Sequence, residues 1–245
     1  MATSPKSNTN VFMYLLNGKL IGYDTSLANE TDIGTPTSGA GNGMAYYDNY
    51  IYLATPTNVS RYGPLNGAQA MANAYWGTTL ALAVLTNTTY PSINGVAMPN
   101  HVMHRHTDAK LYFCDVLSNT TANTNKGALH YIKTTKTTVE GDTNDGSTYN
   151  ALDFPWGVYP STIETYGTDL AVALFEGTDT TIRTRRAKLS FWDTTSSSFQ
   201  KIHEEEFPDP LITAMKNVNG ILYVWSGSAS GGCRLTRFVG GHTME

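Results

Sequence analysis

The fold is decided by the stretch Ile163-Glu-Thr-Tyr-Gly-Thr-Asp-Leu-Ala-Val-Ala-Leu174 and by Leu189-Ser-Phe-Trp-Asp193 after it. A first β-prone run ends in the polar turn Gly167-Thr-Asp169, and two further apolar runs follow. Short runs of β-branched and aromatic residues, separated by turn residues, are typical of antiparallel strands joined one to the next. This segment therefore predicts three neighbouring strands of one meandering sheet.

The same unit recurs along the chain. Apolar strands equivalent to the one at Leu170 begin near Val11, Tyr50, Leu111 and Ile221, and each is followed by a strand that begins near Leu20, Val59, Leu129 or Leu235. Earlier strands are predicted near Met44, Met103, Ile163 and Met215, and outer fourth strands at Thr79-Leu-Ala-Leu-Ala83 and Phe199-Gln-Lys-Ile-His203. A repeat of roughly 40–60 residues with three or four meandering strands is the blade of a β-propeller.

The sequence thus predicts an all-β chain, a β-propeller of about five blade-like units built from meandering antiparallel sheets. We expect one domain over residues 1–245, with repeat units at about 7–40, 41–98, 99–160, 161–210 and 211–245. The first unit lacks a clear inner strand, and the last ends before an outer strand. Either the ring closes with about five blades, or the chain belongs to an open or larger assembly. A β-sandwich or a β-solenoid with coincidental spacing is the alternative fold.

Composition excludes several classes of protein. Only 15% of the 245 residues are charged, the net charge is −4, and 40% are hydrophobic, so the chain is not intrinsically disordered. No apolar run approaches the ~18 residues that span a bilayer, and no signal peptide is evident. The mild acidity argues against a nucleic-acid partner. We therefore expect a protein without membrane association. The two cysteines, Cys114 and Cys233, lie in apolar runs and are expected to be buried free thiols.

The most provocative local motif is His101-Val-Met-His104-Arg-His106. Strand alternation places His104 and His106 on one face and His101 on the other. Two such imidazoles can share a metal ion, with Asp108 or His130 as further ligands. The motif lies on a predicted inner strand, however, where polar rings line a wet channel. We therefore predict a channel-lining, hydrogen-bonded role, and neither a metal nor another cofactor.

The four tryptophans fall into two pairs. Trp192 and Trp225 lie within repeat strands and are expected in the core, whereas Trp76 and Trp156 lie in connectors beside glycine and are expected to be exposed. Exposed indole rings can serve as platforms for sugars. Trp76 and Trp156, with His104 and His106, are therefore the candidate binding residues.

No catalytic residue is predicted. Glycoside hydrolysis needs two carboxyl groups roughly 5–10 Å apart, and the candidates on or near predicted inner strands are Asp48, Asp108, Glu164 and Asp169. Three of these four lie in turns. The sequence favours a non-enzymatic protein, and a carbohydrate-binding or glycoside-processing propeller is the alternative.

Four segments carry a resemblance to a known group. They are Met98-Pro-Asn-His-Val-Met-His-Arg-His-Thr-Asp108, the run from Tyr131 to Tyr149, Lys188-Leu-Ser-Phe-Trp-Asp-Thr-Thr-Ser196 and Arg237-Phe-Val-Gly-Gly241. Over about the last 150 residues the chain resembles propeller-like hypothetical proteins of metagenomes and uncultured tailed phages. The resemblance implies a structural, tail-associated or otherwise virion-associated component without established catalytic residues, located in a virion or in the cytoplasm of the host cell. Its implied partners are other structural proteins or copies of itself, with glycans as the alternative.

Overall fold

A computed structural model shows an all-β chain that divides into two compact units, which are described separately. Met1–Leu85 with Ile132–Tyr149 make up unit 1, and Thr86–Tyr131 with Asn150–Glu245 make up unit 2. The structure describes residues 2–3, 12–23, 30–35, 43–48, 50–54, 58–63, 65, 80–81, 92–93, 96–97, 102–119, 124–133, 150–178, 181–182, 186–195, 199–228 and 231–239.

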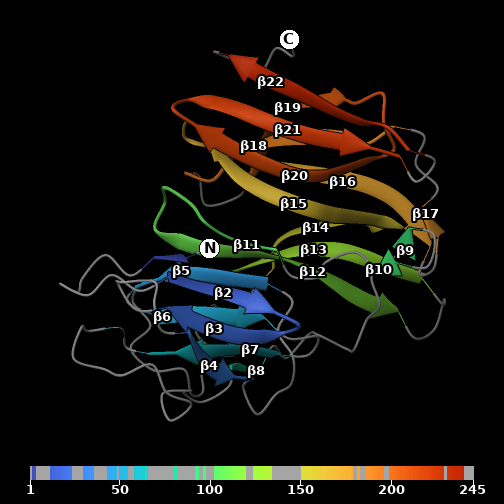
Figure 1. Cartoon of the computed structure of the whole chain (residues 1–245). Helices are drawn as coiled ribbons and strands as arrows, with labels where there is room; N and C mark the ends of the chain where they lie inside the picture. The colour runs from blue at the N-terminus through green and yellow to red at the C-terminus, as the bar shows by residue number, and fades with distance from the viewer. Residues whose placement is uncertain are drawn as a thin grey trace. The chain divides into compact units, whose positions relative to one another are not determined.

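Unit 1 contains two four-stranded antiparallel sheets, each with its strands in chain order (Figure 1). The first comprises β1 (Ala2–Thr3), β2 (Phe12–Leu16), β3 (Lys19–Tyr23) and β4 (Glu30–Gly34). The second comprises β5 (Gly43–Tyr47), β6 (Tyr50–Ala54), β7 (Asn58–Tyr62) and β8 (Leu80–Ala81). One apolar cluster, which includes Met13, Leu20, Ile51 and Tyr62, joins the two sheets.

Unit 2 contains three larger antiparallel sheets and a two-stranded ribbon, β9 (Ser92–Ile93) with β10 (Val96–Ala97). The first sheet is formed by β11 (Met103–Arg105), β12 (Lys110–Asn119), β13 (Thr124–Lys133) and β14 (Asn150–Trp156). The second has β15 (Val158–Tyr166), β16 (Asp169–Thr178), β18 (Lys188–Asp193) and β19 (Gln200–Glu206), with β17 (Thr181–Ile182) paired to β16. The third has β20 (Leu211–Val218), β21 (Ile221–Gly227) and β22 (Cys233–Val239).

Strand β16 explains why the second strand of a unit is apolar at successive positions. Leu170, Val172 and Leu174 pack into a cluster with residues of β12 and β13. Ala171 and Ala173, on the opposite face, pack into a second cluster with residues of β18, β21 and β22. Because side chains alternate between the two faces of a strand, β16 is buried on both. The core of unit 2 thus lies between successive sheets.

Tight turns connect these strands. At Asn17-Gly18 and Asn219-Gly220 both residues have positive φ, with values of 49°, 77°, 53° and 83° along the chain. This backbone is typical of two-residue hairpin turns whose twist matches that of the flanking strands, and it favours Asn-Gly. The polar turns predicted from sequence at Asp48 and at Gly167 also have positive φ.

The predicted strands are confirmed, with two differences in detail. The first sheet has a short inner strand, β1, where the sequence showed none clearly. Cys233 is exposed, so the expectation that both cysteines are buried was wrong for it, whereas Cys114 is buried. Cys233 lies in the outermost strand of its sheet, and no described strand covers it there. That residues 1–245 form a single domain stays a prediction. No helix able to span a bilayer occurs in the described part of the chain.

Candidate functional site

A cluster of polar side chains joins the first strands of the three sheets of unit 2. We call it the inner-strand cluster, and it consists of His104 with the adjacent His106 after β11, Glu164 and Thr165 of β15, and Lys216 and Asn217 of β20. Most of these residues line an open hollow of about 420 Å³. Strand alternation correctly predicted that the side chains of His104 and His106 lie on the same face.

Thr165 is the centre of this cluster. Its hydroxyl oxygen lies 2.8 Å from Nε2 of His104 and 2.8 Å from Nδ1 of His106. A hydroxyl donates one hydrogen bond and accepts others, so it can donate to one imidazole and accept from the other. The backbone carbonyl of Thr165 accepts a hydrogen bond from Nδ2 of Asn217 at 2.9 Å. One residue of β15 therefore links all three strands.

Glu164 supplies the only carboxylate among the described side chains that line the hollow. Its Oε2 lies 3.1 Å from Nζ of Lys216, and its Oε1 lies 3.3 Å from Nε2 of His104. The carboxylate is nearly buried, whereas the lysine is largely exposed. Lys216 thus balances a charge that would otherwise lie uncompensated in the protein.

Both imidazoles in the cluster are held in the neutral form. Burial lowers the pKa of His104 to about 4, with Lys216 and His106 acting in the same direction and Glu164 opposing them. Burial also lowers the pKa of His106, against the influence of Asp108. At neutral pH the contact between His104 and Glu164 therefore joins the carboxyl group to a neutral ring and is not an ion pair. Neutral rings can both donate and accept, as the bridge through Thr165 requires.

The further ligands considered for a metal are engaged elsewhere. Asp108 accepts a hydrogen bond from the Tyr112 hydroxyl at 2.6 Å and pairs with Lys110 at 3.0 Å. His130 stacks on Phe113 with ring centroids 5.3 Å apart. His101 lies outside the described residues. Within the described ranges, no group of three or more His, Cys, Asp or Glu side chains could hold a metal ion.

We expect Lys216→Met to lower the free energy of unfolding by about 1–2 kcal/mol. Removing one partner of a buried ion pair costs several kcal/mol, but the exposure of Lys216 reduces that cost through solvent screening. Chemical denaturation measures the change. Glu164→Gln in the same background should recover most of the loss, because a neutral amide needs no cation. A double-mutant cycle with strictly additive effects would contradict the role assigned to the pair.

The tryptophans are placed only partly as predicted. Trp156, at the end of β14, is 50% exposed, as expected. Trp76 lies outside the described residues. The prediction that Trp192 and Trp225 lie in the core was wrong, because both are half-buried, Trp192 at the edge of an apolar cluster. The structure does not bring Trp156 into the inner-strand cluster, and a sugar-binding role for it stays a prediction.

The outer edge of β22 is the second notable feature of unit 2. Each of the other four large sheets has at least four strands, whereas this sheet has three among the described residues. No described strand pairs with β22 on the side away from β21. Leu235 and Val239 on β22 are 56% and 43% exposed. A seven-residue edge with exposed apolar side chains is a template for pairing with another chain.

Comparison with known proteins bears on the fold. The solved structures that match include the extracellular domain of a putative one-component system from B. thetaiotaomicron, at 13% identity and a TM-score of 0.54, over 97% of this chain and 27% of that one. The WD40 domain of Neurospora crassa Pan2 matches at 7% identity and a TM-score of 0.50, over 97% of this chain and 61% of that one. The Trypanosoma rangeli sialidase in complex with sialic acid matches at 9% identity and a TM-score of 0.51, over 96% of this chain and 45% of that one.

WD40 domains are built from four-stranded blades arranged as a propeller, and the same meander recurs in the five large sheets described here. The fold is a β-propeller. This propeller chain spans about a quarter of the first matching structure and less than two thirds of the other two. At these identities the likeness concerns the fold alone. Neither a protein-family model nor a curated protein matches the propeller chain.

Proposed function

We propose that this propeller is a non-enzymatic structural and interaction module that associates through β22 with β22 of a second copy. The observation that carries the proposal is the exposed edge strand of the last sheet. Leu235 and Val239 lie on it, and no described strand pairs with its outer side. Pairing of two such edges would continue each three-stranded sheet into the other by main-chain hydrogen bonds.

An antiparallel pair of identical strands has two-fold symmetry, which is the commonest symmetry of homo-oligomers. If the pair is centred on Thr236, Leu235 lies opposite Arg237 of the other copy, and Arg234 lies opposite Phe238. No arginine then faces an arginine directly, so the like-charge repulsion that weakens cross-strand pairs is avoided. Arg234 is also compensated by Asp209, whose Oδ2 lies 3.3 Å from its Nε.

The low charge of the chain supports association. Only 15% of residues are charged and the net charge is −4, so long-range repulsion between copies is weak. The resemblance to propeller-like proteins of uncultured tailed phages supports a phage-like particle as the setting. The comparisons with solved structures bear on the fold only. Capsid, portal or tail genes beside the gene for this chain are the expected genomic context, and a neighbourhood of metabolic genes would argue against it.

Sedimentation velocity of the purified chain tests the association. We expect a concentration-dependent dimer, and we expect Leu235→Lys to raise its dissociation constant about tenfold. The reason is that the new ammonium lies opposite Arg237 at two symmetric positions, and each unfavourable cross-strand pair costs up to about 1 kcal/mol. Leu235→Glu, which places a carboxylate opposite the same arginine, should weaken the dimer much less.

The matched control is Val218→Lys. Val218 is 47% exposed but lies on β20, away from the edge, so this variant should dimerise like the parent chain. A chain that stays monomeric at all concentrations would refute the proposal. Equal effects of Leu235→Lys and Leu235→Glu would also refute the proposed pairing.

A further inference from the structure

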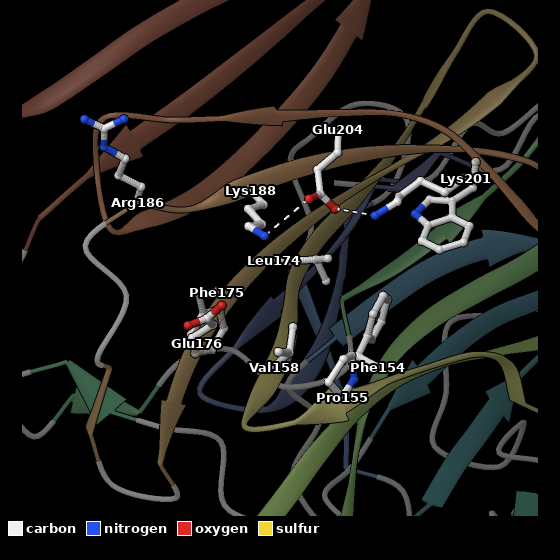
Figure 2. Close-up of a pocket in the computed structure, with 11 residues that line it drawn as sticks. Phe154, Pro155, Val158, Leu174, Phe175, Glu176, Arg186, Lys188, Lys201 and Glu204 are labelled. Carbon is white, nitrogen blue, oxygen red and sulfur yellow. Dashed lines mark hydrogen bonds and ion pairs between the residues drawn. The ribbon is translucent and has the colours of Figure 1, made fainter.

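A pocket beside the second sheet of unit 2, at the opposite end of β15 from the inner-strand cluster, has the character of a ligand site. It lies among the end of β14, the start of β15, and strands β16, β18 and β19 (Figure 2). Its volume is about 360 Å³, within the range of small-molecule sites. None of the described residues that line it belongs to the inner-strand cluster or to β22, so the site is independent of the proposed association.

One side of the pocket is apolar and well fixed. Phe154 and Leu174 are nearly buried, and Val158 lies beside them in the lining. Trp192 lies between this side and the charged side, because it is paired with Lys201 across β18 and β19, and its Nε1 donates a hydrogen bond to Oγ of Ser190 at 2.8 Å. That hydrogen bond satisfies the indole N–H and holds the ring in place. A flat apolar or aromatic group would find a preformed surface here.

The opposite side carries charge. Figure 2 shows Lys188 and Lys201 on either side of Glu204, across the pocket from Phe154. The carboxylate of Glu204 lies 3.3 Å from Nζ of Lys188 and 2.9 Å from Nζ of Lys201. Burial alone would raise the pKa of Glu204, but hydrogen bonds from Lys201 and Lys188 outweigh it and hold the pKa below its ordinary value. Glu204 is therefore an anion that only accepts hydrogen bonds.

The two ammonium groups can accommodate a second anion. Each carries three N–H donors, so a lysine that bonds to Glu204 still has donors to offer. Arg186 is a third cation of the lining but pairs with Glu206 at 3.7 Å, and Glu176 and Glu204 are the carboxylates of the described lining. The donors available to a ligand are therefore those of Lys188 and Lys201, which share the single carboxylate of Glu204. A cationic ligand would meet these lysines unfavourably, and a neutral apolar ligand would leave their donors without a ligand partner.

We propose that this pocket binds a small amphipathic anion, with an aromatic or apolar body against Trp192 and Phe154 and a carboxylate at Lys188 and Lys201. The apolar body removes hydrophobic surface from water, and the carboxylate fixes the orientation of the ligand. The combination of a mostly apolar lining with a few convergent polar groups is the usual composition of a specific small-molecule site.

Isothermal titration with three matched probes tests the proposal: 4-phenylbutyrate, its neutral amide and 4-phenylbutylamine. At about −0.3 kcal/mol per heavy atom, a probe of this size should bind with a Kd on the order of millimolar. We expect the acid to bind about five-fold more tightly than the amide, which is the effect of one partly exposed charge pair. The amine should bind more weakly than either.

Two variants localise the binding. Lys201→Met, which keeps the apolar part of the side chain and removes the ammonium group, should raise the Kd of the acid about five-fold and leave that of the amide nearly unchanged. Lys19→Met is the control, because Lys19 is a similarly exposed lysine that pairs with Asp32 at 2.9 Å in unit 1. Equal binding of acid, amide and amine would overturn the proposal. So would binding of a neutral disaccharide in place of the acid, or an unchanged Kd in Lys201→Met.

Discussion

Replacing Gly127 by alanine is expected to lower the free energy of unfolding by about 3 kcal/mol or more. Gly127 lies in β13, and a Cβ atom there would meet Cδ of Pro160, with the Val158 carbonyl oxygen 2.7 Å and the Tyr159 Cα 2.8 Å away. These atoms belong largely to the backbone of β15 in the next sheet, so they cannot turn aside as a flexible side chain can. Overpacking of this kind costs 1–3 kcal/mol or more.

Chemical denaturation of the Gly127→Ala chain measures this loss. Gly220→Ala is the matched control, because a Cβ there would meet nothing within 4 Å, although its φ of 83° strains any other residue. The control should cost about 1 kcal/mol. If the two variants were equally stable, the close approach of β13 to β15 would not be as tight as the structure has it.

Acidification from pH 7 to pH 4 should remove about 3 kcal/mol of stability through His104 alone. The pKa of this ring is about 4 in the folded chain, against an ordinary value of 6.5. Below pH 6.5 the unfolded chain therefore binds a proton that the folded chain does not, and each pH unit in this window costs about 1.4 kcal/mol. The loss is complete near pH 4. The lowered pKa of His106 acts in the same direction.

His104→Gln tests this linkage, since an amide can bond to Thr165 but does not titrate between pH 4 and pH 7. The free energies of unfolding of parent and variant should differ by an amount that changes by about 3 kcal/mol over this range. Carboxylates that titrate in the same range act on both chains and cancel in the difference. Parallel stability curves would show that the burial of His104 does not hold its ring neutral.

Local sequence patterns predicted the strands well, and the reason is physical. A strand such as Leu170–Leu174, covered on both faces, must be apolar throughout, and its turns need residues that accept positive φ. Both features can be read from a few neighbouring positions. The shared face of His104 and His106 could be predicted in the same way, because it depends only on alternation along one strand.

The partners of those histidines could not be predicted, because they come from other sheets. Thr165 and Lys216 are 61 and 112 residues away from His104 along the chain. The predicted fold placed His104 and Glu164 on inner strands. It did not predict which residues of neighbouring blades lie beside each other. The pocket beside Trp192 was missed for a similar reason. A strand residue whose sequence pattern predicts burial in the core lines a pocket only where the neighbouring strands leave space beside its side chain.

The two faces of β16 have one further consequence. Its leucines and valine belong to one apolar cluster and its alanines to another, so separating either neighbouring sheet from β16 exposes a face of the same strand. Structural elements that share a core in this way tend to open together as one cooperative unit. The three large sheets of unit 2 are therefore expected to melt as a single foldon, and the slowest amide hydrogen exchange in the unit belongs in β16.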